Sequence, residues 1–378
     1  MALPASGAIR MGADIGVELG NTATSMISIG ATAPRALAGV PSGAIRVAAD
    51  FYGKASAFSF TISANQQQAN LRTLALAAGW NGTSVVTATV NAGVYIWSDV
   101  TGIAALTIDG SWPNGVTLIN NGYIIGKGGN GGSNLQQNVN TSIKPGGNGG
   151  SAMSLSINNL IIVNNSGAFI AGGGGGGGSG GFYSPSSVSW AGSGGGGAGG
   201  GSGGYTQNTF FVNAPGGNGG SVGTSGSDGT ALEAATSIGS GGGGGRILPG
   251  TGGQGGFYGS VSSNQGFGRG GGAGGGGGHG YVEVDGATPT GVGGTGGSAN
   301  NVGGNSTVDL DPFDGAYDQA GNGGGGGGWG ASGGTGTQGG NGPSPGSTWS
   351  GGSGGKAIAL NGYTATIGGS GTIYGAIS

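Results

Sequence analysis

The sequence contains no cysteine and a single histidine, His279, among its 378 residues. Without cysteine there can be no disulfide framework and no thiolate metal site. Charged residues make up only 6% of the chain, and five of its ten basic residues fall within the first 72 positions. The remainder therefore lacks the basic stripe that a phosphate backbone requires, and we expect no binding of nucleic acid.

Long apolar runs are also missing. No stretch approaches 18 consecutive apolar residues, so we expect no membrane insertion. The first residues, Met-Ala-Leu-Pro, do not form a charged leader followed by an apolar core, and we expect no secretory signal. A protein that acts outside cells without an export signal would fit release by lysis.

Groups that commonly carry catalysis are scarce. His279 lies inside a glycine run, where no neighbouring side chain could orient it for general-base chemistry. The pattern Gly-x-Gly-x-x-Gly arises by chance at this glycine density, and no run continues as Gly-Lys-Ser/Thr, so a phosphate-binding loop is not expected. We predict no catalytic residue, no enzymatic activity and no cofactor.

One acidic cluster could in principle hold a cation. Its members are Asp309, Asp311, Asp314 and Asp318. The segment 309–315 is close to a calcium loop, but its third acid is one position late and no closing glutamate follows at the required distance. A pair of glycan-cleaving carboxylates is a second reading. A solvated loop is the simpler one, and we predict no metal site.

Glycine is present in large excess. Of the 107 glycines, 14 fall in residues 1–120 and 93 in the remaining 258. We place a domain boundary at the change, near residues 121–129. So much glycine normally indicates a flexible linker. Here bulky residues interrupt the runs at intervals, as a linker would not require: Phe182, Trp190, Tyr205, Phe257, Tyr281 and Trp329.

The glycine runs are continuous, as in 172–178 and 323–328, and do not have the Gly-X-Y form of collagen. Glycine allows backbones to approach one another without interference from Cβ atoms. We therefore predict a mostly β or irregular fold, with a polyglycine II helix bundle or sandwich and short β-strands. Such helices have no internal hydrogen bonds, so neighbouring helices must satisfy one another's N–H and C=O groups.

The pattern predicts eight helical runs: 171–181, 191–204, 215–229, 238–245, 249–256, 268–280, 291–304 and 321–334. If the helices alternate in direction, the connections between them emerge at two ends. One end would gather residues 182–190, 230–237, 257–267 and 305–320. The other would gather residues 205–214, 246–248 and 281–290.

The first 125 residues have a different character. The segment Pro4–Met11 recurs as Pro41–Val47, and each copy predicts a polar turn leading into a short amphipathic element. Beyond it we predict a small α+β or mostly β domain, with a helix over 66–80 and strands at 58–62, 85–90, 94–97, 106–108 and 116–119. A second repeat, Leu118–Ile125 against Ile162–Ile170, indicates stacked units that share a core.

Several motifs occur in an order that supports a family resemblance. They are Pro41–Arg46, Asp50–Lys54, Leu106–Tyr123, the glycine runs and Gly362–Ser378. In this order the chain resembles the glycine-rich receptor-binding tail proteins of tailed phages. Its glycine region is similar to the distal tail-fibre adhesins of T-even-type phages, in which loops between polyglycine helices bind outer-membrane proteins or lipopolysaccharide. The chain departs from these adhesins in carrying its own N-terminal module.

The resemblance implies an adhesin at the tip of a phage tail, located in the virion and extracellular on release. Residues 1–60 would be a virion-attachment module that binds phage tail proteins, residues 61–125 a small domain, and residues 126–378 the receptor-binding domain. Its partner would be a bacterial outer-membrane protein or lipopolysaccharide. The candidate receptor-binding residues are Phe182, Tyr183, Trp190, Phe257, Tyr258, Phe267, Asp311, Phe313, Asp314 and Tyr317.

Alternatives remain open at this point. The aromatic side chains could serve only to cover the open ends of the bundle, and not to anchor a receptor. The protein could be a structural spacer of the tail fibre, although a spacer would be expected to repeat itself and these loops are dissimilar. An ice-binding glycine-helix protein would have no use for the N-terminal module.

Overall fold

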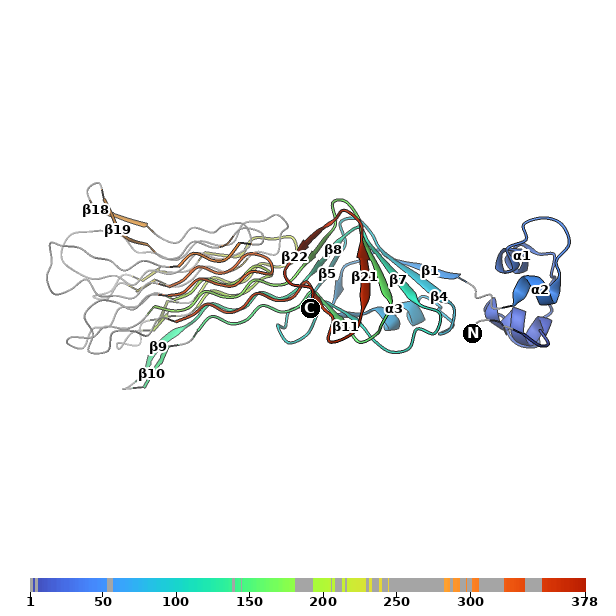
Figure 1. The fold of residues 1–378 in the computed structure, drawn as a ribbon. Coiled ribbons are helices and arrows are strands. Elements are labelled where there is room, and N and C mark those ends of the chain that lie inside the picture. Colours follow the sequence, from blue (N-terminus) through green and yellow to red (C-terminus); the bar gives the residue numbers. More distant parts are fainter. Residues whose placement is uncertain are drawn as a thin grey trace.

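The computed structural model describes most of residues 3–180 and 349–378 and parts of the region between them. The described ranges are 3, 6–52, 57–137, 140–143, 145–180, 193–204, 206–207, 213–214, 216–228, 231–232, 238–239, 244, 282–285, 288–292, 297, 301–305, 323–336 and 349–378. The fold is mostly β with few helices (Figure 1), as predicted. Within these residues no helix is both long and apolar enough to cross a membrane.

The N-terminal module contains three short helices: the π-helix η1 (Met11–Gly16), α1 (Thr32–Ala38) and α2 (Val47–Phe51). It has a small core of its own, built around Ile15, Leu37 and Phe51. Figure 1 places it at the end of the molecule opposite the glycine segments.

The two copies of the N-terminal sequence repeat form equivalent structures. Each leads into a helix, η1 after Arg10 and α2 after Arg46. In each copy the arginine N–H donates to the carboxylate four residues later, at 2.6 Å. The hydrogen bonds from Arg10 lower the pKa of Asp14, because they favour its ionised form. Each repeat therefore forms the predicted turn followed by a short element, and the structure shows that this element is helical.

Residues 57–171 and 357–378 contain three parallel sheets. Sheet A has the order β1-β4-β7-β12-β21, sheet B β2-β5-β8-β13-β22 and sheet C β3-β6-β11-β20. Each turn of the chain adds one strand to each sheet in succession, so the whole is a three-sided parallel solenoid (Figure 1). The last turn closes with a bridge from Ile377 to Ile358.

The strands of the solenoid are short. Those of sheet A are β1 (Ala57–Ile62), β4 (Val85–Val90), β7 (Val116–Asn120), β12 (Leu160–Asn164) and β21 (Ala365–Gly368). Those of sheet B are β2 (Gln66–Gln67), β5 (Tyr95–Trp97), β8 (Tyr123–Ile125), β13 (Phe169–Ala171) and β22 (Thr372–Tyr374). Those of sheet C are β3 (Ala69–Asn70), β6 (Leu106–Ile108), β11 (Met153–Leu155) and β20 (Ile358–Ala359).

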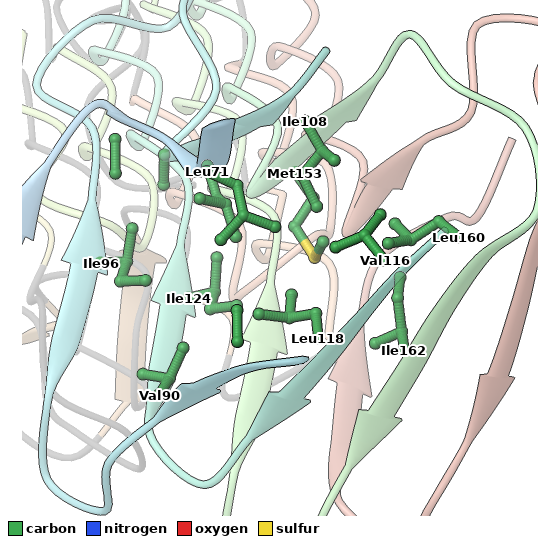
Figure 2. Close-up of a cluster of buried hydrophobic side chains, with 14 of the residues drawn as sticks. Leu71, Val90, Ile96, Ile108, Val116, Leu118, Ile124, Met153, Leu160 and Ile162 are labelled. Carbon is green, nitrogen blue, oxygen red and sulfur yellow. The ribbon is translucent and has the colours of Figure 1, made fainter. Parts of the chain in front are cut away.

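The core of the solenoid consists of rows of like side chains (Figure 2). Parallel register stacks Leu118 on Ile162 in sheet A and Ile124 on Ile170 in sheet B. These side chains point inward because alternate residues of a strand face opposite sides. The repeat seen in the sequence at 118–125 and 162–170 therefore corresponds to two adjacent turns, and the prediction of stacked units is confirmed.

Buried asparagines occupy the corner between sheets A and B. The Nδ2 of Asn120 donates to Oδ1 of Asn164 at 2.8 Å, and Nδ2 of Asn164 donates to the carbonyl of Thr372 at 3.2 Å. Both side chains are fully enclosed, so these bonds satisfy polar groups that water cannot reach. The Asn-Asn pair of the sequence repeat thus stabilises the bend in two adjacent turns.

The helix predicted over 66–80 is shorter than expected. Residues 66–67 and 69–70 pair with β5 and β6 as β2 and β3, and the helix α3 covers only Leu71–Ala77. Gln68 turns the corner between the two strands with φ of 50°. The side chain of Asn70 then starts the helix by accepting a hydrogen bond from the N–H of Thr73 at 3.0 Å. Pairing with distant strands overrides the helical pattern before residue 71.

The glycine-rich sequence consists of two insertions into this solenoid. Residues 126–152 lie between β8 and β11, and residues 172–357 lie between β13 and β20. Both leave sheet B and return to sheet C, and therefore start from the same corner. The boundary predicted after residue 125 falls where the first insertion begins. Strands before and after this boundary belong to the same sheets, for example β8 and β13 in sheet B. The division into three domains stays a prediction.

A core substitution tests the solenoid. Leu118→Ala should lower the free energy of unfolding by about 2–5 kcal/mol, because it leaves a cavity at a fully buried site. Thr117→Ala, one residue earlier in the same strand and only partly buried, should change it by less than about 1 kcal/mol. Denaturant unfolding followed by circular dichroism measures both. Equal effects of the two substitutions would contradict the inward orientation of Leu118.

Candidate functional site

The glycine insertions form a lattice of backbone segments, with residues 172–178 at its centre. Successive N–H groups of this central segment point to three neighbours in turn, and every third residue returns to the same neighbour. Gly173 and Gly176 donate to the segment 146–150, Gly174 and Gly177 to 193–198, and Gly175 and Gly178 to 330–336, all at 2.8–3.0 Å. The hydrogen-bonding period is therefore three residues.

The carbonyl groups of the central segment use three further neighbours. Those of residues 173–178 accept hydrogen bonds from N–H groups of the segments 126–132, 323–328 and 349–356. Six segments thus surround residues 172–178, and both backbone polar groups of each residue from 173 to 178 are paired. Three of the six, 126–132, 146–150 and 349–356, are absent from the eight runs that the sequence predicts, because single Asn, Lys or Ser residues interrupt their glycines.

No side chain can be accommodated in the central segment. A Cβ atom added to any of the residues 172–178 would lie much closer than 3.0 Å to a carbonyl oxygen of a neighbouring segment, and real Cβ atoms do not approach other atoms so closely. The obstructing atoms belong to the backbone and cannot rotate away. Glycine is therefore required at all seven positions.

Asparagine side chains complete the hydrogen bonding at the edge of the lattice. The Oδ1 atoms of Asn130, Asn148 and Asn305 accept from the backbone N–H groups of Ser202, Ser353 and Thr335, at 3.1, 2.9 and 2.8 Å. All three asparagines are exposed. Each amide oxygen accepts a hydrogen bond from the neighbouring segment, as backbone carbonyl oxygens do in the interior. This explains the asparagine in the middle of the repeated Pro-Gly-Gly-Asn-Gly-Gly motif at 145–150.

Short turns reverse the chain where the lattice meets the solenoid. They lie at 198–200, 221–224 and 329–330, and each contains glycine with positive φ, among them Gly199 at 95° and Gly330 at 66°. The turn residues Ala198 and Trp329 pack against Ile125 and Ala171 of sheet B. Trp329 is only 1% exposed. These contacts join the lattice to the solenoid.

A row of aromatic rings borders this junction on sheet B. Tyr95, Tyr123, Phe169 and Tyr374 lie one above the other, with successive ring centroids 4.5, 5.7 and 5.9 Å apart. Parallel register places the first three side by side on successive turns. Burial, and to a lesser degree the neighbouring Tyr123, raise the pKa of Tyr95. The row forms part of the cluster around Trp329.

The other ends of the segments lie together, far from the solenoid. Hydrogen bonds join residue 132 to 177, 194 to 132, 204 to 194, 178 to 334 and 336 to 349. The connections 133–145, 181–192, 205–215, 306–322 and 337–348 all start and finish at such ends. We call this the far end of the lattice.

The sequence predicted that successive connections would emerge at alternate ends of the bundle. For the first two connections this prediction is wrong. Residues 182–190 and 205–214 were expected at opposite ends, yet the segments that flank them end at the same place. The run 191–204 is in fact two segments, because the chain reverses at 198–200. The runs 215–229 and 321–334 reverse in the same way, at 221–224 and 329–330.

Short strands are described at the far end. A four-stranded sheet has the order β10-β9-β14-β15 and joins two connections, and two further hairpins are β16–β17 and β18–β19. Figure 1 shows β9, β10, β18 and β19 at the far side of the lattice from the solenoid. Their bounds are β9 (Asn134–Gln137), β10 (Asn140–Ile143), β14 (Thr206–Gln207), β15 (Asn213–Ala214), β16 (Ala231–Leu232), β17 (Ile238–Gly239), β18 (Val282–Asp285) and β19 (Thr288–Val292). The β9–β10 hairpin was not predicted from the sequence, although the break in glycine at 133–144 marks its position.

All ten candidate receptor-binding residues fall outside the described residues. They are Phe182, Tyr183, Trp190, Phe257, Tyr258, Phe267, Asp311, Phe313, Asp314 and Tyr317. The acidic cluster at 309–318 and His279 lie outside as well, and these assignments stay predictions. Among the residues that are described, no group of three His, Asp or Glu side chains could hold a metal ion.

A comparison with known families adds an independent observation. The model of the family described as phage tail fibre adhesin Gp38 matches residues 57–260, which is more than half of the chain. The chain belongs to the Gp38 family of phage tail fibre adhesins. The adhesin is therefore a protein of the phage virion tail, as predicted. The matched range begins with β1 and covers the start of both glycine insertions.

One solved structure is also similar to the adhesin. It is the crystal structure of the gp37-gp38 adhesin tip complex of the bacteriophage S16 long tail fiber, with 17% identity, a TM-score of 0.44 and coverage of 91% of each chain. No curated protein matches the sequence of the adhesin.

A single added methyl group tests the lattice. Gly175→Ala should disrupt it, because the new Cβ would collide with the carbonyl of Gly352. We expect faster hydrogen exchange across 172–178 and a lower unfolding temperature. Gly368→Ala, where a Cβ would have nothing within 4 Å, should change stability by less than about 1 kcal/mol. Unchanged exchange in the Gly175 variant would contradict the packing described here.

The lattice edge can be tested at Asn148. Asn148→Ala removes the acceptor for the N–H of Ser353 and should cost about 0.5–1.5 kcal/mol. Asn148→Asp keeps an acceptor at the same place and should retain protection of that N–H from exchange. Hydrogen exchange at residue 353 distinguishes the two. If both variants lose protection equally, the amide oxygen is not what holds this N–H.

Proposed function

We propose that the far end of the lattice binds a receptor on the surface of the host bacterium. The observation that carries the proposal is the convergence of the five connections named above, whose flanking segments are hydrogen-bonded to one another at one end. A rigid scaffold that holds several loops side by side is a common design for recognition, because the loop tips can vary while the core does not. Membership of an adhesin family supports the same function.

The scaffold in this proposal is a bundle of polyglycine II helices. The three-residue period of donors, the six neighbours of residues 172–178 and the pairing of backbone groups between segments support this geometry. Fixing so many glycines is entropically unfavourable, so the bundle must form through many inter-segment bonds at once. At its centre, in residues 172–178, such a bundle leaves no room for side chains.

We assign receptor contact to the aromatic and acidic residues predicted from the sequence, from Phe182 to Tyr317. The receptor would be an outer-membrane protein or lipopolysaccharide, and binding would involve no chemical reaction. Residues 1–60 would attach the adhesin to other tail proteins. The separate core of this module supports an independent role, as does the start of the family match at residue 57.

Loop replacement tests the function and the site separately. Purified protein should adsorb to host cells and compete with phage adsorption. Replacing 182–190, 257–267 or 306–320 by Gly-Ser of equal length should weaken adsorption at least about tenfold in one or more variants. Asn305 is kept because its side chain holds the N–H of Thr335. The control is the same replacement of the near-solenoid turn 221–224, which should leave adsorption unchanged.

The outcomes separate the alternatives. No adsorption by the intact protein would contradict receptor binding and favour a structural spacer. Adsorption that survives all three loop replacements would retain the function but remove it from these loops. Loss of adsorption in the control as well would indicate damage to the scaffold, and hydrogen exchange across 172–178 would show it.

A further inference from the structure

A cleft of about 440 Å³ lies on the solenoid, at the corner between sheets C and A. It is lined by loops of three turns of the chain, which contribute Trp112 and Pro113, Ser156 to Asn159, and Tyr363. The glycine insertions leave from another corner, between sheets B and C. Clefts of about 300–1,000 Å³ are typical of sites that enclose small ligands. We call this feature the corner pocket.

The indole of Trp112 is held in one orientation. Its ring stacks on Trp80 with centroids 4.7 Å apart and planes 21° apart, and its Nε1 donates to the carbonyl of Asp109 at 2.9 Å. The guanidinium of Arg72 lies over the other partner, Trp80, at 5.7 Å from the ring. Because these contacts order the ring in advance, a ligand that packs on Trp112 does not bear the entropic cost of immobilising it.

A tight turn presents Tyr363 to the pocket. Asn361 and Gly362 have φ of 52° and 86°, and the N–H of Tyr363 donates to the carbonyl of Leu360 at 2.9 Å. Positive φ at both central residues is the geometry of a type I′ turn, for which Asn-Gly is the favoured sequence. The turn therefore fixes the position of the tyrosine, whose ring is half-buried.

Two amide side chains supply hydrogen-bonding groups. The Oδ1 of Asn158 accepts from the N–H and hydroxyl of Thr364 at 3.1 and 3.3 Å, which orients the amide and leaves its NH₂ available as a donor. Asn159 next to it is exposed and has φ of 59°, a conformation that asparagine adopts more readily than most residues. Its amide is a second group among the lining residues that can both donate and accept hydrogen bonds.

The chemistry of the lining selects a class of ligand. None of the residues that line the corner pocket is charged, so it offers no charged partner to neutralise a phosphate or carboxylate. Aromatic faces attract the weakly positive C–H face of a sugar ring, and asparagine amides both donate to and accept from its hydroxyls. We propose that the corner pocket binds one neutral pyranose unit of a glycan. This site is separate from the far end and does not rest on the function assigned to it.

Sugar binding by the full chain tests the proposal. The probes are the methyl glycosides of glucose, galactose, mannose and N-acetylglucosamine, with glucuronic acid and sialic acid as charged counterparts. Saturation-transfer NMR should detect about millimolar binding of at least one neutral sugar and weaker binding of the acids. Tyr363→Ala and Trp112→Ala should each weaken binding about tenfold or more.

Asn159→Gly is the variant that separates binding from folding. It removes the amide but suits the positive φ, so the protein should remain at least as stable while binding weakens. Asn91→Ala, which removes an exposed amide elsewhere on the solenoid, is the matched control and should bind normally. The far-end loop variants, in which 182–190 or 306–320 is replaced, should also bind sugar normally.

Three results would overturn the proposal. They are the absence of binding for all four neutral sugars at tens of millimolar, binding that survives both Asn159→Gly and Tyr363→Ala, and loss of sugar binding in the far-end loop variants. Loss of sugar binding in the far-end loop variants would place the sugar site at the far end and not in the corner pocket. It would not contradict the proposed receptor binding at the far end.

Discussion

The close approach of one backbone to another governs this molecule. In residues 172–178 every Cα faces a neighbouring carbonyl at a distance that excludes a Cβ atom, and every N–H bonds to a different segment from its own. An α-helix pairs its own N–H and C=O groups, whereas each of these segments must pair them with its neighbours. The ordering of glycine, which is costly in conformational entropy, is offset only when all neighbours are in place. The lattice must form collectively.

The solenoid supplies the register from which this lattice starts. Strands β8 and β13 pair in parallel up to Ile125 and Ala171. The same pairing then continues into the glycine segments, with hydrogen bonds from Gly126 to Ala171, Gly129 to Gly174 and Gly132 to Gly177. The first two segments of the lattice are thus extensions of paired strands. Where the turns at 198–200 and 329–330 meet sheet B, Trp329 and the aromatic row pack together in one hydrophobic cluster.

Under the proposed function, this arrangement separates the residues that stabilise the fold from those that contact the receptor. The central segment 172–178 admits no side chains, so the larger and more varied side chains lie at the connections, the edges and turns of the lattice and the solenoid corners. A change in a connection leaves the interior bonds untouched, because those bonds involve only backbone atoms. The corner pocket follows the same logic on the solenoid, where loops of successive turns bring Trp112, Asn159 and Tyr363 together although they are up to 251 positions apart in the chain.

From the sequence alone we could predict the mostly β character, the turn leading into a short element at each N-terminal repeat, the stacked units at 118–125 and 162–170, and the need for glycine backbones to pair with one another. Local composition carries these features. The three-dimensional structure was needed to show that the strands are parallel, that the glycine sequence is inserted at one solenoid corner, and that the chain reverses at 198–200. A reversal made of glycine has the same composition as the run around it, and the pairing of β12 with β21 joins residues about 200 positions apart. The ten candidate receptor-binding residues remain a prediction from the sequence. The segments that flank 181–192 and 306–322 end at the far end of the lattice, which bears on two of the three loops that carry these residues.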